Sequence, residues 1–585
     1  MSKLITKKVI NSPETCVDDN LRGVVALYPN LKLHPKHRVV TIRQNSDSKR
    51  VAVLGGGGSG HEPFAAGLIG SGMLDGAVAG GVFASPPTGN VLYAITQLYK
   101  YNSGGVLVLL GNYTGDRLNF GKAFEKARVA GIKVEGFIVG EDVASSHNKT
   151  GGRSMCGEVF LYKLCGGMAH RGYDLQTIHS MAGEVNKHMA TLGICLTACS
   201  LPGQPPLFEI AADEMEIGAG VHGEAGVEKR KMGTAKEIVA IILDQVTAHL
   251  KLEAGARVAA MINNMGGTSL MEMNIIAAEI KDYLVQKKIR LERIFSGHLK
   301  TSLDMQGFQI CLLHLNDTYG DLWLELIDLP TDALGWVGGA MSVGEGELED
   351  GDDEDDEDGT LNDKQKKPSG PPLSARARKL ARSALSAACA ELARREQLLN
   401  TLDSGCGDGD CGITLKNFAE AIKSYSETAS FEYPSKFLWD LSEIAETDMG
   451  GTSGGVYSLG LAAAAQEFMN AETNNSETWL SAWNSAMAAI TKYGGAEPGD
   501  RTMLDTLHAA ATAFKEALSE SNSMKIVLEK VIEAADKGAK ATANMVARAG
   551  RASYVASVYT RDEDAGARAA AVWIEAILRT IIEHC

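Results

Sequence analysis

The feature that most constrains the fold is an acidic segment in the middle of the chain. Residues 345–358 hold eleven acidic residues and no basic residue, and residues 359–372 add proline, glycine, lysine and small polar residues. A segment with so much charge and so few apolar side chains cannot form a packed core. We therefore predict a disordered linker over residues 345–373 between two folded parts. Its composition favours a solvated spacer, and binding of a basic partner is the alternative.

Before this segment, short apolar strands alternate with helical patterns. The strand patterns cover residues 50–54, 105–110, 134–139, 257–262 and 308–313. Apolar strands separated by helices are typical of parallel sheets that are covered on both faces. This part is longer than one usual domain. We therefore expect two α/β subdomains, residues 1–200 and 201–344, divided where a Pro- and Gly-rich stretch breaks the pattern.

After the acidic segment, the pattern is helical. Alanine is frequent, strand patterns are absent, and apolar residues recur at positions i, i+3, i+4 and i+7. This spacing covers residues 374–402, 452–471, 479–493, 504–519 and 524–547. Residues 374–585 are therefore expected to form an all-α domain whose chemistry lies in its loops.

Composition and charge exclude several classes of function. No apolar run reaches the ~18 residues of a membrane span, and the first residues lack a signal-peptide core. The net charge is −16, but outside residues 345–358 it is only −5, and no basic stripe occurs, which argues against nucleic-acid binding. The ten cysteines show neither zinc spacing nor a paired framework. We expect a cytoplasmic protein with reduced thiols and no membrane partner.

Residues 402–412, LDSGCGDGDCG, place three carboxylates on a loop of small residues, namely Asp403, Asp408 and Asp410. Three close acids repel one another unless a cation lies among them. Mg²⁺ takes few protein carboxylates and completes its shell with phosphate and water oxygens. The pattern favours a metal–phosphate site, and a solvated Asx-turn is the alternative. A calcium EF-hand is excluded, because Gly412 stands where an acid is needed and no Glu closes the loop.

Residues 51–63, VAVLGGGGSGHEP, predict a strand, a glycine turn and a helix that begins at Pro63. Gly55, Gly57 and Gly60 formally satisfy the dinucleotide-binding pattern G-x-G-x-x-G. No acidic residue follows a second strand at the usual distance, however. An oxidoreductase that binds NAD or FAD is therefore only a distant alternative.

Two further motifs offer candidate chemistry. Residues 111–116, GNYTGD, follow a strand, at the edge where α/β sheets bind ligands. Asp116 in this motif is either a general base or a helix N-cap. Residues 218–226, GAGVHGEAG, surround His222 with glycines and predict an accessible histidine. The chain contains no Walker A sequence, so any use of ATP does not involve a P-loop.

The motifs GGGSGHEP, NYTGD, GVHGEAG and LDSGCGDGDCG occur in this order. Together they closely resemble the motifs of the single-chain ATP-dependent dihydroxyacetone kinases, called triokinase/FMN cyclase in animals. Residues 449–454, 493–505 and 549–554 also match, so the resemblance covers nearly the whole chain except the linker. It implies an α/β substrate-binding half followed by a helical-barrel nucleotide-binding half.

The resemblance implies roles for residues in the first half. His222 would bond to the substrate carbonyl as a hemiaminal, and glycerol would be rejected because an alcohol cannot form this adduct. His61 and Asp116 would be an acid/base pair, with Asp116 taking the proton of the attacking hydroxyl. The positions that line the substrate pocket are Gly58, Ser59, Gly60, His61, Gly111 and Asp116. Family members commonly carry a substrate-contacting lysine where this chain has Gly111, and losing such a donor can cost ~2–4 kcal/mol.

The resemblance also implies roles for residues in the second half. Asp403, Asp408 and Asp410 would hold two Mg²⁺ ions on the phosphates of ATP, which supplies the charge neutralisation that phosphoryl transfer needs. The expected nucleotide contacts are Asp408, Gly409, Asp410, Cys411, Thr452, Ser453, Gly494, Thr502, Met503, Asp564, Ala565 and Gly566. The match is loose at Ala565, where the family usually has proline.

The resemblance leaves other functions open. The helical half could split FAD into AMP and riboflavin cyclic 4′,5′-phosphate, a lyase reaction that would favour Mn²⁺ or Co²⁺ over Mg²⁺. The chain could also act as a regulator, because animal relatives can restrain an antiviral RNA sensor. The intact acidic loop argues against an inactive enzyme. A homodimer is expected from the resemblance alone.

Overall fold

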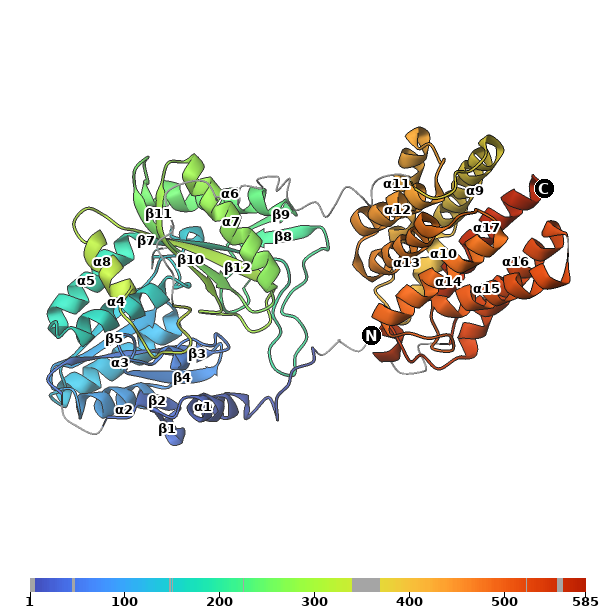
Figure 1. Cartoon of the computed structure of the whole chain (residues 1–585). Coiled ribbons are helices and arrows are strands. Elements are labelled where there is room, and N and C mark those ends of the chain that lie inside the picture. Colours follow the sequence, from blue (N-terminus) through green and yellow to red (C-terminus); the bar gives the residue numbers. More distant parts are fainter. Residues whose placement is uncertain are drawn as a thin grey trace. The chain divides into compact units, whose positions relative to one another are not determined.

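The computed structural model describes residues 6–44, 48–146, 149, 151–224, 226–338, 369–521, 523–554 and 561–584. The chain divides into two compact units, Met1–Asp352 and Asp353–Cys585 (Figure 1). Most of the segment predicted as a linker, residues 345–368, lies outside the described residues. Its last residues pack on the second unit, since Leu373 is buried in a core of that unit. The predicted order of an α/β half and an all-α half is confirmed.

The first sheet carries most of the parallel strands. Its order is β1-β2-β4-β3-β5-β6, and β4, β3, β5 and β6 run parallel, while β1 and β2 form an antiparallel edge. The strands are β1 (Leu31–His34), β2 (Val39–Ile42), β3 (Val51–Ser59), β4 (Gly76–Val82), β5 (Gly105–Gly111) and β6 (Val134–Val139). The strands predicted near residues 50, 105 and 134 are therefore confirmed as β3, β5 and β6.

The second sheet is mostly antiparallel, so the prediction of parallel sheets is wrong here. Its order is β11-β10-β12-β7-β8-β9, and only β10 and β11 are parallel. The loop of residues 298–306 is too short for the dozen or more residues of a parallel crossover, so β12 enters beside β10 in the opposite direction. The strands are β7 (Met189–Cys195), β8 (Glu214–Ile217), β9 (Glu228–Lys231), β10 (Arg257–Asn264), β11 (Arg290–Gly297) and β12 (Gly307–His314). The first of them, β7, lies before residue 200, where the division into subdomains is predicted.

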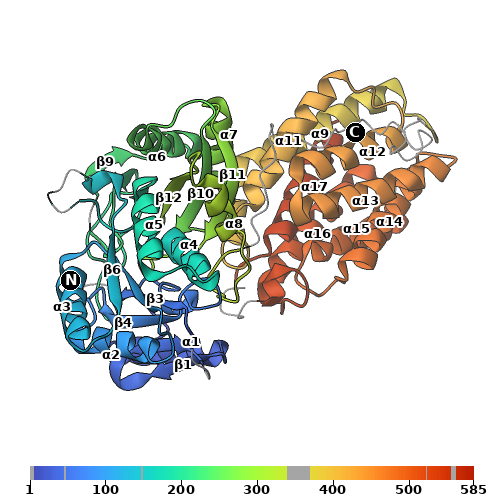
Figure 2. The same cartoon turned by 90° about the vertical axis from the view of Figure 1, so that its left-hand side faces the viewer.

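Helices form three layers around the two sheets (Figures 1 and 2). Side chains alternate along β5: Leu107 and Leu109 pack in the core between the sheets, and Val106 and Val108 pack against the outer helices. Met261 of β10 packs in the same core between the sheets. The inner helices are α4 (Glu158–His170), α5 (Leu175–Lys187) and α8 (Gly320–Ile327). The outer helices are α2 (Thr88–Tyr99) and α3 (Thr114–Val129) on the first sheet, and α6 (Ala235–Leu250) and α7 (Leu270–Gln286) on the second. Helix α1 (Cys16–Leu27) lies beside β1 and β4.

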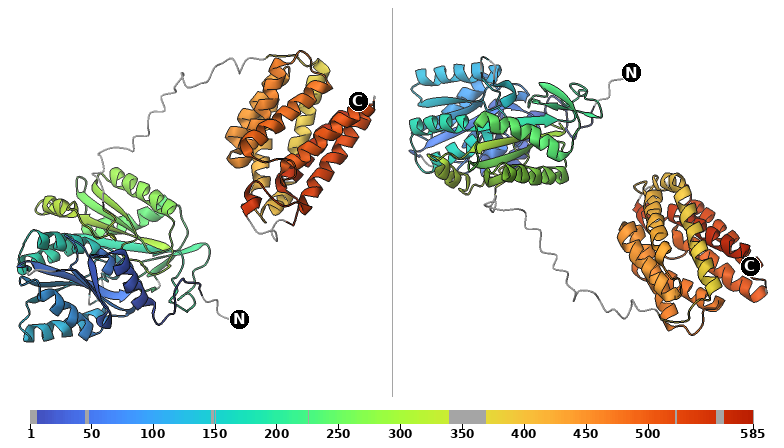
Figure 3. Two further views of the ribbon diagram at one scale, coloured as in Figure 1. Left: turned by 60° about the horizontal axis from the view of Figure 1, so that its bottom comes forward. Right: turned by 90° about the horizontal axis from the view of Figure 1, so that it is seen from above.

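The second unit is a ring of antiparallel helices around an apolar interior (Figure 3). In its described part, α9 and α11 to α17 each pack against the next helix, and α17 returns to α9, which closes the ring. The helices are α9 (Ala375–Arg394), α10 (Glu396–Asp403), α11 (Cys411–Thr428), α12 (Pro434–Ile444), α13 (Gly451–Asn470), α14 (Ser476–Gly494), α15 (Met503–Glu520), α16 (Met524–Ala541) and α17 (Ala565–Glu583). The five predicted helical stretches are confirmed, the first of them divided into α9 and α10 at Arg395.

Among the described helices, none combines the length and the apolar character that crossing a membrane requires.

Candidate functional sites

His61 and His222 lie against each other although 160 residues separate them in the sequence. His61 follows the end of β3, and its Nδ1 lies 2.7 Å from the carbonyl oxygen of Thr301. The two imidazole rings meet edge to face with centroids 4.9 Å apart. The helix predicted to begin at Pro63 is wrong, because residues 61–65 form turns before a short 3₁₀ helix, Ala66–Leu68. His61 is therefore held by tertiary contacts just beyond the carboxyl end of β3, in the first sheet.

Burial keeps His222 neutral, and aromatic rings surround it. Its ring lies 4.4 Å from that of Tyr113 and 5.5 Å from that of Phe83, centroid to centroid. Burial lowers the pKa of His222 to about 4, Glu224 opposes this shift, and the cations Lys300 and Arg153 add to it. A neutral imidazole keeps a ring-nitrogen lone pair, which a nucleophile needs. The glycine-flanked histidine, predicted to be accessible, is thus a neutral group that is only partly exposed and packs among aromatic rings.

Asp116 is a buried carboxyl in the first turn of α3. Tyr113 is the N-cap residue of that helix, so the alternative that Asp116 is the N-cap is wrong. Burial raises the pKa of Asp116 to about 6, the Ser85 hydroxyl and Lys300 lower it, and Glu158 raises it further. A carboxyl whose pKa lies this close to neutrality is suited to general base catalysis.

Two buried polar atoms of these candidate residues lack hydrogen-bond partners. Neither Oδ1 of Asp116 nor Nε2 of His61 has a hydrogen-bond partner among the residues that the structure describes. Buried polar atoms are nearly always satisfied in folded proteins, so an unsatisfied pair points to a ligand with hydroxyl or carbonyl groups. The α/β unit therefore holds a neutral imidazole in contact with a second histidine, a buried carboxyl whose pKa lies near neutrality, and two buried polar atoms without a protein partner.

The small residues at positions 58–60 allow the end of β3 to pack closely against residues 83 and 84. Gly60 has a φ of +96°, and a Cβ atom there would lie 2.8 Å from the Phe83 ring. A Cβ atom on Gly58 would lie 3.0 Å from the backbone nitrogen of Ala84. Ser59 is oriented by its own hydrogen bond, since its hydroxyl donates to the carbonyl oxygen of Gly80 at 2.9 Å. Any larger side chain at the two glycines would displace residues 83 and 84.

In the helical unit, the predicted nucleotide contacts gather at one end of the ring. Because neighbouring helices are antiparallel, α11, α13, α15 and α17 all begin at this end, while α10 and α14 finish there. Thr502 is the N-cap of α15, Asp564 is the N-cap of α17, and Gly494 is the last residue of α14. The other predicted contacts lie in the same loops and first turns, namely Gly409, Cys411, Thr452, Ser453, Met503, Ala565 and Gly566. Helix N-termini favour anions such as phosphates.

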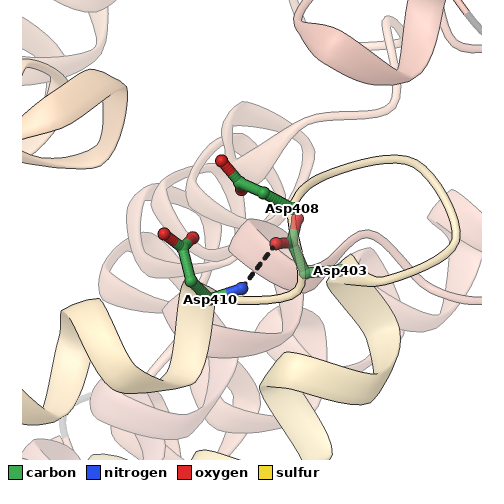
Figure 4. Close-up of side chains that lie close together, drawn as sticks. All are labelled: Asp403, Asp408 and Asp410. Carbon is green, nitrogen blue, oxygen red and sulfur yellow. Dashed lines mark hydrogen bonds between the residues drawn. The ribbon is translucent and has the colours of Figure 1, made fainter. Parts of the chain in front are cut away.

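The three acids of the loop between α10 and α11 lie together at this end (Figure 4). Asp403, Asp408 and Asp410 each offer a carboxylate oxygen, and these oxygens lie within 4.8 Å of one another. The Asp403 carboxylate accepts the backbone N–H groups of Gly409 at 2.9 Å and of Asp410 at 3.2 Å, which holds the loop in shape. A Cβ atom on Gly407 would lie 2.2 Å from an Asp403 oxygen, so a side chain there would displace the Asp403 carboxylate. This set of hard oxygen donors fits Mg²⁺.

Arg501 and Asp564 also lie at this end of the ring. Arg501 is 1% exposed, and its Nη1 lies 3.9 Å from Oδ2 of Asp564. Burial raises the pKa of Asp564 to about 6, and Arg501 opposes this shift. Arg501 was not singled out from the sequence, although it stands inside the matched motif of residues 493–505. That motif was the signal that could have found it.

Known proteins match both units. Residues 22–333 match the Dak1 domain, and residues 405–579 match the DAK2 domain. Triokinase/FMN cyclase of Homo sapiens is 41% identical over 589 residues, 99% of each chain, and dihydroxyacetone kinase 2 of Saccharomyces cerevisiae is 33% identical over 589 residues, 96% of each. The crystal structure of the C. freundii dihydroxyacetone kinase in complex with AMP-PNP and Mg²⁺ superposes with a TM-score of 0.65 at 30% identity, covering 98% of this chain and 99% of that chain.

The fold, the two sites and these matches define the class of protein as a kinase with an α/β unit and a helical nucleotide unit. More particularly, the chain belongs to the dihydroxyacetone kinase family. Use of Mg²⁺ with ATP agrees with the bound AMP-PNP and Mg²⁺ of the C. freundii enzyme.

Proposed function

We propose that this protein transfers the γ-phosphate of ATP to dihydroxyacetone and to glyceraldehyde, with the substrate held covalently on His222. One observation carries the proposal: a neutral, partly exposed imidazole lies against His61, and His61 and the buried Asp116 each keep one polar atom without a protein partner. The relatives named as triokinase and as dihydroxyacetone kinase support the same substrate class.

The mechanism begins at His222. A ring nitrogen of the neutral imidazole forms a bond to the carbonyl carbon, the carbonyl oxygen gains a proton, and the other ring nitrogen releases one. This step needs no net proton, and it anchors only substrates that carry a carbonyl group. His61 and Asp116 then bind the hydroxyl groups of the anchored substrate through the two atoms that have no protein partner.

Asp116 acts as the general base of the transfer. It takes the proton of the terminal hydroxyl while that oxygen bonds to the γ-phosphorus of ATP, and the bond to the β-phosphate oxygen breaks to release ADP. Bound Mg²⁺ neutralises phosphate charge. The carboxylates of Asp403, Asp408 and Asp410 would hold it, and the N-termini of α11, α13, α15 and α17 are suited to the remaining phosphate charge.

The direct test is ATP-dependent phosphorylation of dihydroxyacetone by the purified chain with Mg²⁺, followed through a coupled glycerol-phosphate dehydrogenase assay. We expect turnover with dihydroxyacetone and none with glycerol. Equal turnover with glycerol would contradict anchoring through a carbonyl, and no turnover with either triose would contradict the proposed activity.

The pH profile of this reaction is expected to report on Asp116. Because burial raises the pKa of Asp116 to about 6, the carboxyl is protonated below that pH and cannot accept a proton. We therefore expect kcat/KM to fall about tenfold per pH unit below about pH 6. This fall is the acid limb of the pH profile. His222, whose pKa is about 4, stays neutral in this range and does not set the limb. A profile that stays flat down to about pH 5 would contradict the role of Asp116, and Asp116→Asn serves as the control that lacks the limb.

We infer a second activity at the helical unit, the cleavage of FAD into AMP and riboflavin cyclic 4′,5′-phosphate with Mn²⁺ or Co²⁺. It is supported by the human relative, which is named as an FMN cyclase as well as a triokinase and is matched over 99% of its length. Release of AMP from FAD, separated by chromatography, tests it. Homodimerisation and an antiviral-sensor partner stay predictions from the resemblance.

A further inference from the structure

A buried lysine lies near the residues of the proposed triose site. Lys300 is 2% exposed, and its Nζ donates to Oε2 of Glu158 at 2.7 Å and to Oγ of Ser154 at 2.9 Å. Its ammonium group also lies 4.5 Å from the centre of the Phe64 ring, and that ring meets the ring of His61 edge to face. A buried ion pair is weak evidence for stability, because apolar side chains often serve a core better. The pair therefore calls for a functional reason.

Lys300 reaches the place toward which a side chain at position 111 would point. A Cβ atom on Gly111 would lie 3.2 Å from the Cβ of Ser154 and 3.1 Å from the ring of Tyr113. Ser154 is the residue that accepts from Lys300, and the Tyr113 hydroxyl donates to the Ser154 carbonyl at 2.7 Å. The loop after β11 thus brings an ammonium group to the spot that β5, ending in Gly111, leaves without a side chain.

We propose that Lys300 supplies the cation of the triose pocket in this chain, and that it acts on Asp116 and His222 through its charge. This inference rests on the proposed triose kinase activity. Three acceptors surround the ammonium group: Oε2 of Glu158, Oγ of Ser154 and, at 3.4 Å, the carbonyl oxygen of Ser154. Its donors therefore face protein atoms, which makes Lys300 a positioning residue rather than a group that touches the substrate.

The charge of Lys300 acts on both reacting groups in the same direction. It lowers the pKa of Asp116 and of His222, so it favours an ionised base and a neutral nucleophile. At Asp116 the opposing charge is Glu158, and the nearby Ser85 hydroxyl also lowers the pKa of the carboxyl. Around His222, the other facing titratable groups are Glu224, Arg153, His61 and Tyr113. Without the Lys300 cation, both pKa values would rise.

The test moves the lysine from one position to the other. In Lys300→Met, we expect the acid limb of kcat/KM for dihydroxyacetone to move about one pH unit upward, since a neighbouring charge shifts a pKa by that order. Lys300→Arg, which keeps the charge, serves as the control and should hold the limb within about 0.3 units of the original. In Gly111→Lys/Lys300→Met, the acid limb is expected to return to its wild-type pH, because the new lysine approaches Ser154 from β5 and so restores the positive charge there. A structural role alone would not predict this rescue.

A second background keeps the test valid if Lys300→Met unfolds because Glu158 is left unpaired. Lys300→Met/Glu158→Gln removes both charges of the pair, and it is compared with the same variant carrying Gly111→Lys. The two proteins differ only in the lysine at position 111. Addition of that lysine must lower the pH midpoint of the limb, and an unchanged midpoint in both backgrounds would overturn the inference.

A measurement that does not depend on enzyme activity tests this inference separately from the proposed function. The pKa of His222 is followed by NMR of histidine-labelled protein, with His222→Ala used to assign the signal. We expect the pKa to rise by about one unit in Lys300→Met. If the wild-type chain phosphorylates no triose, the proposed function fails, and this titration still decides the effect of Lys300. If the chain is an active kinase and neither the limb nor the His222 titration moves, the inference about Lys300 fails.

Discussion

Replacing His222 with alanine is expected to lower kcat/KM for dihydroxyacetone by on the order of a thousandfold or more, as when an enzyme loses its nucleophile. The imidazole is neutral because its pKa is about 4, and it stands beside His61 and Tyr113 at the substrate pocket. Without it, no covalent bond anchors the substrate, and Asp116 has no fixed hydroxyl to deprotonate. The measurements are the coupled kinase assay and native mass spectrometry, in which the mass increase of one bound triose should disappear.

The same variant is expected to cleave FAD at the wild-type rate, because that reaction is proposed for the helical unit. His249→Ala is a matched control, since His249 is an exposed histidine on α6. The thermal midpoint should change by only about 2 °C, because the side chain of His222 is partly exposed and the hydrogen bond from its backbone N–H to Glu224 remains. Unchanged triose turnover in His222→Ala would refute the hemiaminal.

Local patterns in the sequence predicted five strands and five helical stretches that the structure confirms, but they missed others such as β4, β7, α11 and α17. They also could not predict which groups form hydrogen bonds with the backbone. The helix expected at Pro63 illustrates this point. The carbonyl oxygens of Gly60 and His61 accept the N–H groups of Leu303 and Thr301, which come from the loop after β11. These long-range hydrogen bonds, together with the positive φ of Gly60, outweigh the local helical signal of the proline. The direction of β12 likewise depended on a short loop rather than on its apolar pattern.

The candidate sites show the same difference between residues that are close in the sequence and residues that only the fold brings together. The acidic loop could be predicted because its three carboxylates lie within eight residues of sequence, where spacing alone brings them together. The glycine-flanked His222 could be predicted for a similar reason. The pairing of Lys300 with Glu158 could not, because they are 142 positions apart in the sequence and a lone lysine after a strand has no distinctive pattern. Only the packing of α4 between the two sheets makes them neighbours.

The second large effect is expected for Asp408→Ala, which should lower both triose phosphorylation and FAD cleavage by on the order of a hundredfold or more. Asp408 supplies one of three carboxylate oxygens that lie within 4.8 Å of one another, and loss of one donor leaves too few hard ligands to hold a divalent cation on a phosphate. Turnover of both substrates, measured over a range of Mg²⁺ and Mn²⁺ concentrations, tests this. Glu472→Ala is the control, because Glu472 is an exposed acid in the loop between α13 and α14, at the opposite end of the ring.

Thermal unfolding separates loss of the metal from loss of the fold. Without metal, Asp408→Ala should keep its fold, because Asp408 is an exposed loop residue outside the apolar core. With Mg²⁺ and a non-hydrolysable ATP analogue, the wild type should gain stability by mass action and the variant should not. Loss of only one of the two activities would mean that the kinase and the lyase use separate metal sites. Loss of both, with the fold intact, is the result that a single nucleotide site at this end of the helical ring requires.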